Sequence, residues 1–348
     1  MSISPSLFDL PASPHLGPGA AALAAAAAAG AFLVSCLGTR GLIPLLRRRA
    51  LFDVPNERSS HAVPTVRGGG IAVIGALLLV WAGLGVAGRA PSWIGAMAPG
   101  AALVAAVSWI DDVRGVAPAL RLCAQGVAVA VGLALLPAGG GMPPDWLGPA
   151  PALVAVGLLW LWFVNLFNFM DGIDGLAGSE AAAIGGGLAL YAGIGAGVDP
   201  GLAALGAALL GAAAGFLVWN WSPARIFLGD VGSVTLGYGL GFVLLDLARS
   251  GHWQIALILP LYFLADATVT LVRRLLRGER IWLAHRQHFY QRAVQRGLSH
   301  AAVVRRVAAA DLLLILCGWA AENGAGIGAL AAAAAIVAAL LPALARGR

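Results

Sequence analysis

Residues 163–178 read FVNLFNFMDGIDGLAG and place four polar side chains at the end of an apolar run. Asn165, Asn168 and Asp171 are three residues apart, so they share one face for as long as the helix continues. Asp174 follows after a glycine that can bend the chain. Polar residues that close a helix would explain one or two of these four, but not all of them. The pattern therefore predicts a ridge of amides and carboxylates that faces sugar hydroxyls, a base edge or a hydrated metal ion.

The chain around this ridge is too apolar for an ordinary soluble protein. Its 348 residues are 60% hydrophobic and 11% charged, with a mean hydropathy of +0.86, whereas soluble domains carry about 25% charged residues. Runs long enough to cross a bilayer alternate with short charged or Gly/Pro-rich breaks. We therefore predict an all-α, polytopic integral membrane protein, one membrane-embedded domain over 1–348, with about eleven transmembrane helices. They fall at approximately 19–46, 68–88, 94–110, 119–136, 150–168, 177–197, 200–219, 232–248, 253–273, 307–321 and 325–345.

The distribution of arginine predicts the orientation. The sequence has no lysine, so all 22 basic residues are arginine. If the first loop is cytoplasmic, only Arg89 and Arg249 fall on the other side, and 22 minus 2 leaves 20 at or near the cytoplasmic face. This asymmetry predicts a periplasmic N-terminal tail (1–18), a cytoplasmic C-terminus and a cytoplasmic His/Arg loop over 274–305. The net charge of +6 then reflects topology, and we expect no nucleic-acid partner.

The first cytoplasmic loop contains Arg58, His61 and Arg67 among two prolines and three glycines. These residues forbid a regular helix, and such a backbone can approach a phosphate closely. A solvated anchor loop that obeys the positive-inside rule explains the same residues equally well. From this loop alone both interpretations stay open.

Carboxylates also mark two further cytoplasmic span ends. Asp111 and Asp112 are adjacent at the end of the third span, where lipid does not solvate them, so a divalent cation or a role as catalytic base explains the pair better than helix capping. Asp230 lies between two glycines at the start of another span, after a loop that contains Asn220. A helix N-terminus favours a bound anion or a metal-anion pair. A plain N-cap is the alternative for Asp230.

The loop over 274–305 combines histidine with many arginines. His285 and His288 are one helical turn apart and flank Arg286. Zinc is a poor interpretation because no third or fourth Cys or His ligand is in reach. A diphosphate bound by Arg and His fits at least as well as a basic surface helix lying against anionic lipid. Asp266, in the preceding span, is open to a functional role or to structural pairing with an arginine.

All of these groups fall on one predicted face, and the motifs that carry them resemble a known family. They are Asp53-x-Pro-x-x-Arg58-x-x-His61, Asp111-Asp112, Asn165-x-x-Asn168-Phe-Met-Asp171-Gly-Ile-Asp174-Gly, Phe227-Leu-Gly-Asp230-Val-Gly-Ser233 and His285-x-x-His288. These motifs follow one another in this order over about residues 40–300. With them, the chain resembles the polyprenyl-phosphate N-acetylhexosamine-1-phosphate transferases. These are glycosyltransferase family 4 enzymes, relatives of phospho-MurNAc-pentapeptide translocase.

The resemblance implies an enzyme of the bacterial inner membrane with its active site on the cytoplasmic face. It implies Mg²⁺-dependent transfer of a sugar 1-phosphate from a UDP-HexNAc to undecaprenyl phosphate, with release of UMP; Mn²⁺ is the other metal to test. By similarity, Asp230 is the metal ligand, and Asp111 or Asp112 is the carboxylate nearest the reacting phosphates. Asn168, Asp171 and Asn220 match the nucleotide site. The remaining residues assigned to substrate binding are Arg58, His61, Arg67, Asn165, Asp174, His285, Arg286 and His288.

The histidine motif is sparser here than in most of the family, and Ala284 stands where many relatives have Asp. This resembles the subgroup that starts O-antigen or capsule-type glycans. The sequence leaves open which sugar the donor carries and whether the protein forms a homodimer. It also leaves open whether the reaction is a direct displacement or passes through an aspartyl-phosphate intermediate.

Two other classes of membrane protein share features with this sequence. The CDP-alcohol phosphotransferases also carry Asp-x-x-Asp-Gly, but the Gly-x-x-x-Asp-x-x-x-Asp that follows it there is missing here. A transporter with an anion site at the cytoplasmic face would explain the many spans. Transporter sites, however, lie near mid-membrane and often between repeated halves, and this sequence shows neither pattern.

Overall fold

The computed structural model describes residues 17–55, 60, 63–136, 148–194, 198–281, 283 and 285–347. Within these ranges the protein is mostly helical, and seven helical segments are long and apolar enough to cross a membrane. They are α1 (Pro18–Arg48), α3 (Ile94–Arg114), α4 (Pro118–Leu135), α5 (Pro149–Phe169), α7 (Gly201–Asn220), α8 (Asp230–Arg249) and the stretch His300–Ala345. This confirms a helical, multi-pass membrane protein. The count of eleven spans stays a prediction.

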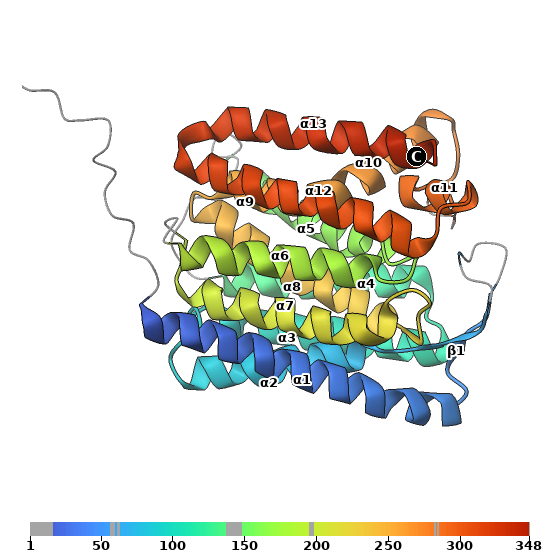
Figure 1. The fold of residues 1–348 in the computed structure, drawn as a ribbon, viewed down its shortest axis with the longest axis horizontal. Helices are drawn as coiled ribbons and strands as arrows, with labels where there is room; N and C mark the ends of the chain where they lie inside the picture. Colours follow the sequence, from blue (N-terminus) through green and yellow to red (C-terminus); the bar gives the residue numbers. More distant parts are fainter. Residues whose placement is uncertain are drawn as a thin grey trace, which may run out of the picture.

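The long helices lie side by side along a common direction (Figure 1). The shorter apolar helix α2 (Gly70–Val86) and α6 (Leu176–Gly193) belong to the same bundle. Helices α6 and α7 approach closely because Gly185 and Gly206 face each other's backbone: a Cβ atom on Gly206 would lie 2.6 Å from the Gly185 carbonyl oxygen. Small residues at such crossings are typical of helix packing in lipid, where close backbone contact replaces the hydrophobic driving force.

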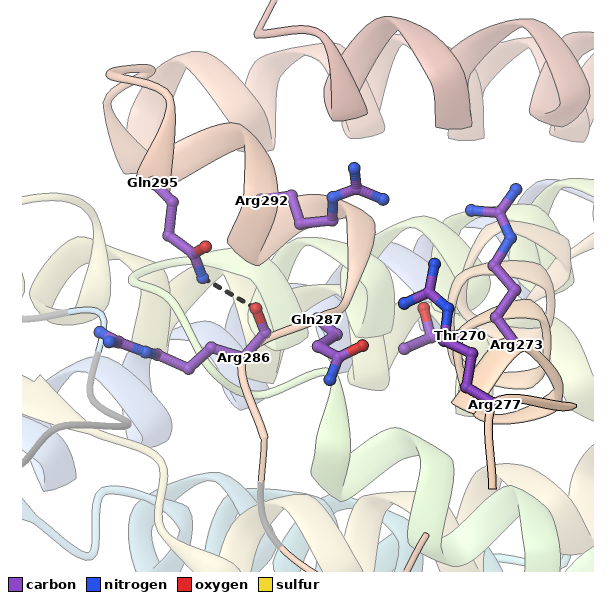
Figure 2. A pocket seen from close by; sticks show the side chains of 7 residues that line it. All are labelled: Thr270, Arg273, Arg277, Arg286, Gln287, Arg292 and Gln295. Atoms are coloured by element: carbon purple, nitrogen blue, oxygen red, sulfur yellow. Dashed lines mark hydrogen bonds between the residues drawn. The ribbon is translucent and has the colours of Figure 1, made fainter. Parts of the chain in front are cut away.

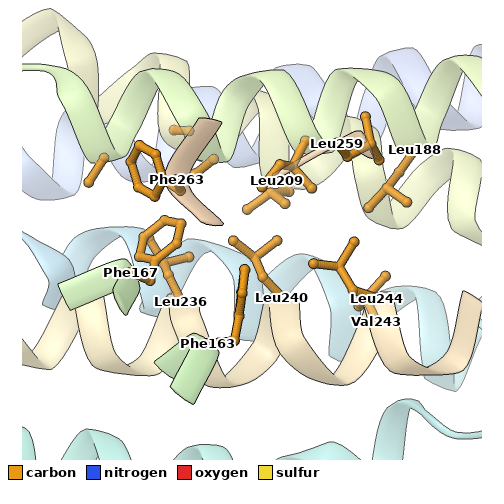
Figure 3. Packing of buried hydrophobic residues seen from close by; sticks show 14 of the residues in the cluster. Phe163, Phe167, Leu188, Leu209, Leu236, Leu240, Val243, Leu244, Leu259 and Phe263 are labelled. Atoms are coloured by element: carbon orange, nitrogen blue, oxygen red, sulfur yellow. The ribbon is translucent and has the colours of Figure 1, made fainter. Parts of the chain in front are cut away.

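The core is built around α8, most of whose side chains are buried. Figure 3 shows Leu236, Leu240 and Leu244 of α8 facing Leu209 of α7 and Leu188 of α6, with phenylalanines from neighbouring helices completing the layer. This packing fixes the position of α8, and therefore the place where its N-terminus emerges from the bundle.

A small sheet, absent from the all-α prediction, joins two loops at the end of the bundle where the C-terminal helix finishes (Figure 1). Strand β1 (Phe52–Asp53) pairs antiparallel with β2 (Thr65–Arg67), and β2 pairs parallel with β3 (Ile226–Phe227). Strands of two or three residues leave no periodic signal in the sequence. Through this sheet, the loop between α1 and α2 is joined to the segment that leads into α8.

Two predicted spans have different limits in the structure. The span expected at 253–273 is divided into α9 (Trp253–Ile258) and α10 (Leu261–Leu276) at Pro260, which has no backbone N–H to continue the helix. Helix α12 (His300–Ala320) begins seven residues before the predicted 307, because the Ser299 side chain caps it by accepting from the Ala302 N–H. The chain then turns within η2 (Ala321–Ala325), where Asn323 and Gly324 leave helical φ/ψ values, and α13 (Gly326–Ala345) lies alongside α12 (Figure 1). The His/Arg loop over 274–305 therefore includes the start of α12 as well as α11 (Phe289–Gln295).

Candidate active site

The aspartate pair at the end of α3, Asp111 and Asp112, lies at the N-terminus of α8. The Asp112 carboxylate accepts hydrogen bonds from the backbone N–H groups of Asp230 (3.0 Å) and Val231 (2.9 Å). Asp112 therefore caps α8 from another helix and satisfies donors that a helix start leaves unpaired. Gly229 precedes this helix with φ of +77°, and a Cβ atom there would lie 2.8 Å from an Asp112 oxygen. Only glycine fits this position without strain.

Two arginines bind the three carboxylates into one cluster, the carboxylate cluster of Asp111, Asp112 and Asp230. Arg67 places Nη2 2.6 Å from Asp112 Oδ1 and 2.7 Å from Asp230 Oδ1. Arg121, in the first turn of α4, places Nη1 2.6 Å from Asp111 Oδ2 and 3.2 Å from Asp230 Oδ2. Burial alone would lower the pKa of Arg67, but the Asp230 and Asp112 carboxylates outweigh it and raise that pKa above its ordinary value. Arg67 is therefore a fixed positive charge beside these carboxylates.

Arg121 was not among the residues assigned to the site from the sequence. Arg114, which follows the aspartate pair in the sequence, is exposed at the end of α3. The available signal was the position of Arg121 in the first turn of the following helix, on the predicted cytoplasmic side. Nothing local in the sequence indicates that this turn lies against α8.

The three carboxylates differ in what holds them. Asp112 accepts two backbone N–H groups, and Asp111 accepts the Val116 N–H at 2.6 Å. The Asp230 carboxylate is held by side chains alone: it accepts from the guanidinium groups of Arg67 and Arg121, and it shares a side-chain hydrogen bond with Asp111. Because side chains move more readily than backbone, Asp230 is the member that can most easily exchange its partners for a cation.

The donor set fits Mg²⁺ at Asp230. Among the described residues, no group of three or more Asp, Glu, His or Cys side chains is arranged to hold a metal ion by itself. Mg²⁺ does not require such a cage, because it is usually bound by one or two carboxylates together with substrate phosphates and water. An exchangeable carboxylate beside two guanidinium groups provides the protein part of such a site.

A cavity of about 280 Å³ opens beside the cluster, between α3, α4, α5 and α8. Leu122 is among its apolar lining residues, and its polar lining consists of Asp230, Arg121, Asn165, Asn168, Ser108 and Gln125. Asn168 donates to the Ser233 hydroxyl at 3.1 Å, and Asn165 donates to Gln125 at 2.8 Å. The polar ridge of residues 165–174 therefore reaches this cavity through Asn165 and Asn168.

The second half of the ridge turns away from the cavity. Burial, followed by the charge of Asp230, raises the pKa of Asp171 well above its ordinary value and favours the neutral acid. Asp174 lies 3.2 Å from His300 Nδ1 and accepts the Ala224 N–H. Burial raises the pKa of Asp174, but the hydrogen bond and charge of His300, with the Ala224 N–H, lower it overall.

Asn220 links the same turn to β3. Its Oδ1 accepts the Gly175 N–H at 2.9 Å, and its Nδ2 donates to the Ile226 carbonyl at 2.9 Å. These contacts, with those of Asp174, hold the 221–225 loop against the turn after α5. His300 was missed from the sequence as a partner, because its position in the fold depends on the return of α12.

The His/Arg loop is anchored by Asp266. This carboxylate accepts the backbone N–H groups of Phe289 (2.9 Å) and Tyr290 (3.1 Å), and His288 Nδ1 lies 3.2 Å from it. The hydroxyls of Tyr262 and Thr270 also donate to Asp266. These contacts support a structural role for Asp266. Its partners are backbone N–H groups and hydroxyls, in place of the arginine that the sequence suggested.

The two histidines of the motif have different surroundings. His288 is buried at the start of α11, while His285 is partly exposed. Burial, then the nearby His288 and Arg274, lower the pKa of His285 to about 4. Tyr290 donates to the Phe169 carbonyl at 2.8 Å, so the loop is joined to the end of α5 and the ridge. Arg58 and His61 lie outside the described residues.

Comparisons with known proteins extend what the geometry indicates. The model of glycosyl transferase family 4 matches residues 94–248, which include the aspartate pair, the ridge and Asp230. A probable undecaprenyl-phosphate N-acetylglucosaminyl 1-phosphate transferase of Bacillus subtilis (strain 168) is 28% identical over 291 residues, covering 78% of each chain.

Two cyanobacterial proteins are also similar, both named phospho-N-acetylmuramoyl-pentapeptide-transferase. The one from Thermosynechococcus vestitus is 30% identical over 269 residues, covering 68% of this chain and 67% of its own. The one from Synechococcus elongatus is 31% identical over 271 residues, covering 69% of this chain and 70% of its own.

Proposed function

The chain belongs to glycosyl transferase family 4, and on that premise we propose that it transfers a HexNAc 1-phosphate from a UDP-HexNAc to undecaprenyl phosphate. The products are polyprenyl diphosphate-HexNAc and UMP. The observation that carries the proposal is the carboxylate cluster at the N-terminus of α8, with two arginines and a cavity beside it.

Phosphoryl transfer requires in-line placement of the reactants and compensation of the charge on the phosphates. Arg67 and Arg121 supply two positive charges at the cluster, and the α8 N-terminus adds its partial charge. Asp230 would hold the divalent cation, Mg²⁺ or Mn²⁺, which when bound supplies further positive charge to the phosphate oxygens. The chain has no lysine, so arginines take the place of the lysine of a P-loop.

The cavity beside Asp230 suits the acceptor lipid. Its polar lining, which includes Arg121 and Asn168, is suited to a phosphate, and its apolar side includes Leu122 and Phe169, which are 49% and 41% exposed. A polyprenyl chain needs such an exit into the bilayer, because its many apolar carbons gain by leaving water. We assign the donor nucleotide to the other side of the cluster, near Asp171 and the His/Arg loop.

The reaction is proposed as a direct displacement. An oxygen of the acceptor phosphate attacks the sugar-bearing phosphorus of the donor, the bond from that phosphorus to the UMP oxygen breaks, and UMP leaves with the bonding electrons. We assign Asp111 to take any proton left on the acceptor, since Asp112 holds two backbone N–H groups of α8. An aspartyl-phosphate on Asp112 would require breaking that cap first, which disfavours the covalent alternative.

The finer assignments belong to the same proposal. The arginine asymmetry supports eleven spans, a periplasmic N-terminus and an active site at the cytoplasmic face of the bacterial inner membrane. The His285-Arg-Gln-His288 motif supports a donor of the O-antigen or capsule-type pathways. The relatives include both N-acetylglucosaminyl and N-acetylmuramoyl-pentapeptide transferases, so the donor is a question for experiment.

The test is release of UMP by the purified full-length protein with undecaprenyl phosphate and a panel of UDP-HexNAc donors, including UDP-MurNAc-pentapeptide. We expect UMP only when the acceptor is present and only with Mg²⁺ or Mn²⁺, with loss of release in EDTA. Absence of UMP across the whole panel would overturn the proposed function. Release that continues in EDTA would overturn the role given to Asp230.

A further inference from the structure

A second cavity, of about 210 Å³, lies between α10 and α11, apart from the residues of the carboxylate cluster (Figure 2). Four arginines line it: Arg273 and Arg277 from the end of α10, Arg286 from the loop, and Arg292 from α11. Thr270, Gln287 and Gln295 complete the lining. Every side chain of this lining can donate a hydrogen bond, and none of them is acidic.

Such a concentration of like charge needs a counterion. Arg273 and Arg277 are one helical turn apart, a spacing at which like charges destabilise a helix. Glu279 Oε1 lies 4.0 Å from Arg277 Nη1. Glu279 Oε2 is already shared between Arg274 Nε and Gln287 Nε2, each at 2.8 Å. One shared carboxylate does not balance the guanidinium groups of Arg273, Arg277 and Arg292, so the cavity favours an anion.

The lining is held in place before any ligand arrives. Gln295 donates to the Arg286 carbonyl at 2.8 Å, as Figure 2 shows. The guanidinium carbon of Arg273 lies 4.8 Å from the centre of the Phe289 ring. Side chains that are already ordered lose less entropy on binding, which favours a ligand that uses several of them at once.

The surroundings of the cavity indicate the source of the anion. On α10, Val272, Leu275 and Leu276 are 48%, 60% and 82% exposed beside Arg273 and Arg277. A helix end that exposes leucines next to arginines matches the boundary between hydrocarbon and headgroups, where arginine reaches the phosphate level. A soluble phosphate compound would need the arginines but not the exposed leucines.

We propose that the arginine cavity between α10 and α11 binds the phosphate of an anionic phospholipid, with the acyl chains lying along the exposed leucines of α10. The bound lipid would compensate the guanidinium groups of Arg273, Arg277 and Arg292 and hold the end of α10 at the membrane surface. This site is separate from the proposed acceptor cavity but shares Arg286 with the loop assigned to the donor. Its test varies Arg273 and Arg277, which are assigned to neither substrate, and it reads lipid binding, so its outcome is distinguishable from that of the transferase test.

The test is native mass spectrometry of the full-length protein in detergent with equal amounts of phosphatidylglycerol and phosphatidylcholine. We expect the wild-type protein to retain phosphatidylglycerol preferentially. The double variant Arg273→Gln/Arg277→Gln should weaken this binding about 30-fold, because each arginine near an anionic headgroup contributes about a factor of five. The matched control is Arg47→Gln/Arg48→Gln, which removes two adjacent exposed arginines from the end of α1 and should bind like the wild type.

Two further arms separate the alternatives. Arg273→Lys/Arg277→Lys preserves both charges and should keep most of the preference, with an unchanged thermal midpoint showing that the fold is intact. Millimolar pyrophosphate should not displace the lipid. Equal retention of both lipids, unaltered binding by the glutamine variant, the same loss in the lysine variant or the α1 control, or full displacement by pyrophosphate would each overturn the proposal.

Discussion

Asp230, at the first residue of α8, and Asp266, inside α10, are both carboxylates on helices, but their partners differ in kind. Asp230 faces two guanidinium groups and a cavity, and its side chain is 16% exposed. Asp266 is fully buried and accepts from two backbone N–H groups and two hydroxyls, with His288 beside it. Mobile charged partners leave a carboxylate able to exchange ligands, whereas backbone partners make it part of the fold. The comparison predicts that replacing Asp230 affects activity, and replacing Asp266 affects stability.

The largest expected effect is on turnover when Asp230 becomes asparagine. The change keeps the shape of the side chain but removes the charge that would hold the cation, so UMP release should fall by about 10³-fold or more. The measurement is UMP release under single-turnover conditions. Turnover within tenfold of the wild type would place the metal elsewhere.

The largest expected effect on stability comes from Asp266→Ala. Two backbone N–H groups, two hydroxyls and His288 lose their acceptor together, which should lower the free energy of unfolding by about 3–5 kcal/mol. Thermal unfolding in detergent measures this change. An unchanged midpoint would contradict the anchoring role; Thr270→Val, which removes only one of the hydroxyls, is the milder control.

A smaller effect is expected at the link between the two regions. Tyr290→Phe removes the hydrogen bond to the Phe169 carbonyl and should lower stability by about 1 kcal/mol. If the loop serves the donor, KM for the UDP-sugar should rise more than kcat falls, because the chemistry at Asp230 is left intact. A fall in kcat with KM unchanged would argue against a role of this loop in donor binding.

The effect expected to be smallest at neutral pH is the pH dependence due to His285. Its pKa falls from the ordinary 6.5 to about 4 on folding, so between these values the unfolded chain binds a proton that the folded protein does not. This residue should therefore reduce stability as the pH falls from about 6.5 to about 4, and have no effect above that range. His285→Gln should lose less stability than the wild type over this interval in thermal scans. Parallel curves for the two proteins would contradict the low pKa.

Several features of the fold and the site were predictable because they depend on local sequence. Apolar runs of span length located the helices, and the aspartates next to span ends indicated the face where Asp111, Asp112 and Asp230 meet. The sequence shows the proline at position 260, but it does not show that the helix is interrupted there. Prolines at other positions lie inside long helices, as Pro99 does in α3.

The features that could not be predicted depend on contacts between distant segments. Arg121 joins the cluster because α4 lies next to α8, and His300 reaches Asp174 because α12 returns to the same end of the bundle. The sheet pairs residues 65–67 with 226–227, and neither segment is long enough to show a strand pattern. The burial of His288 follows from its contact with Asp266, which is 22 residues away in the sequence.

The most direct test of the account is a paired measurement of UMP release and thermal midpoint for Asp230→Asn and Asp266→Asn in the same preparation. The account predicts that Asp230→Asn is inactive with a midpoint equal to or above that of the wild type, since Arg67 and Arg121 keep Asp112 and Asp111 as partners. It predicts that Asp266→Asn unfolds at lower temperature but retains turnover per folded molecule. An active Asp230→Asn protein, or one whose only defect is a lower midpoint, would contradict the assignment of the carboxylate cluster as the active site.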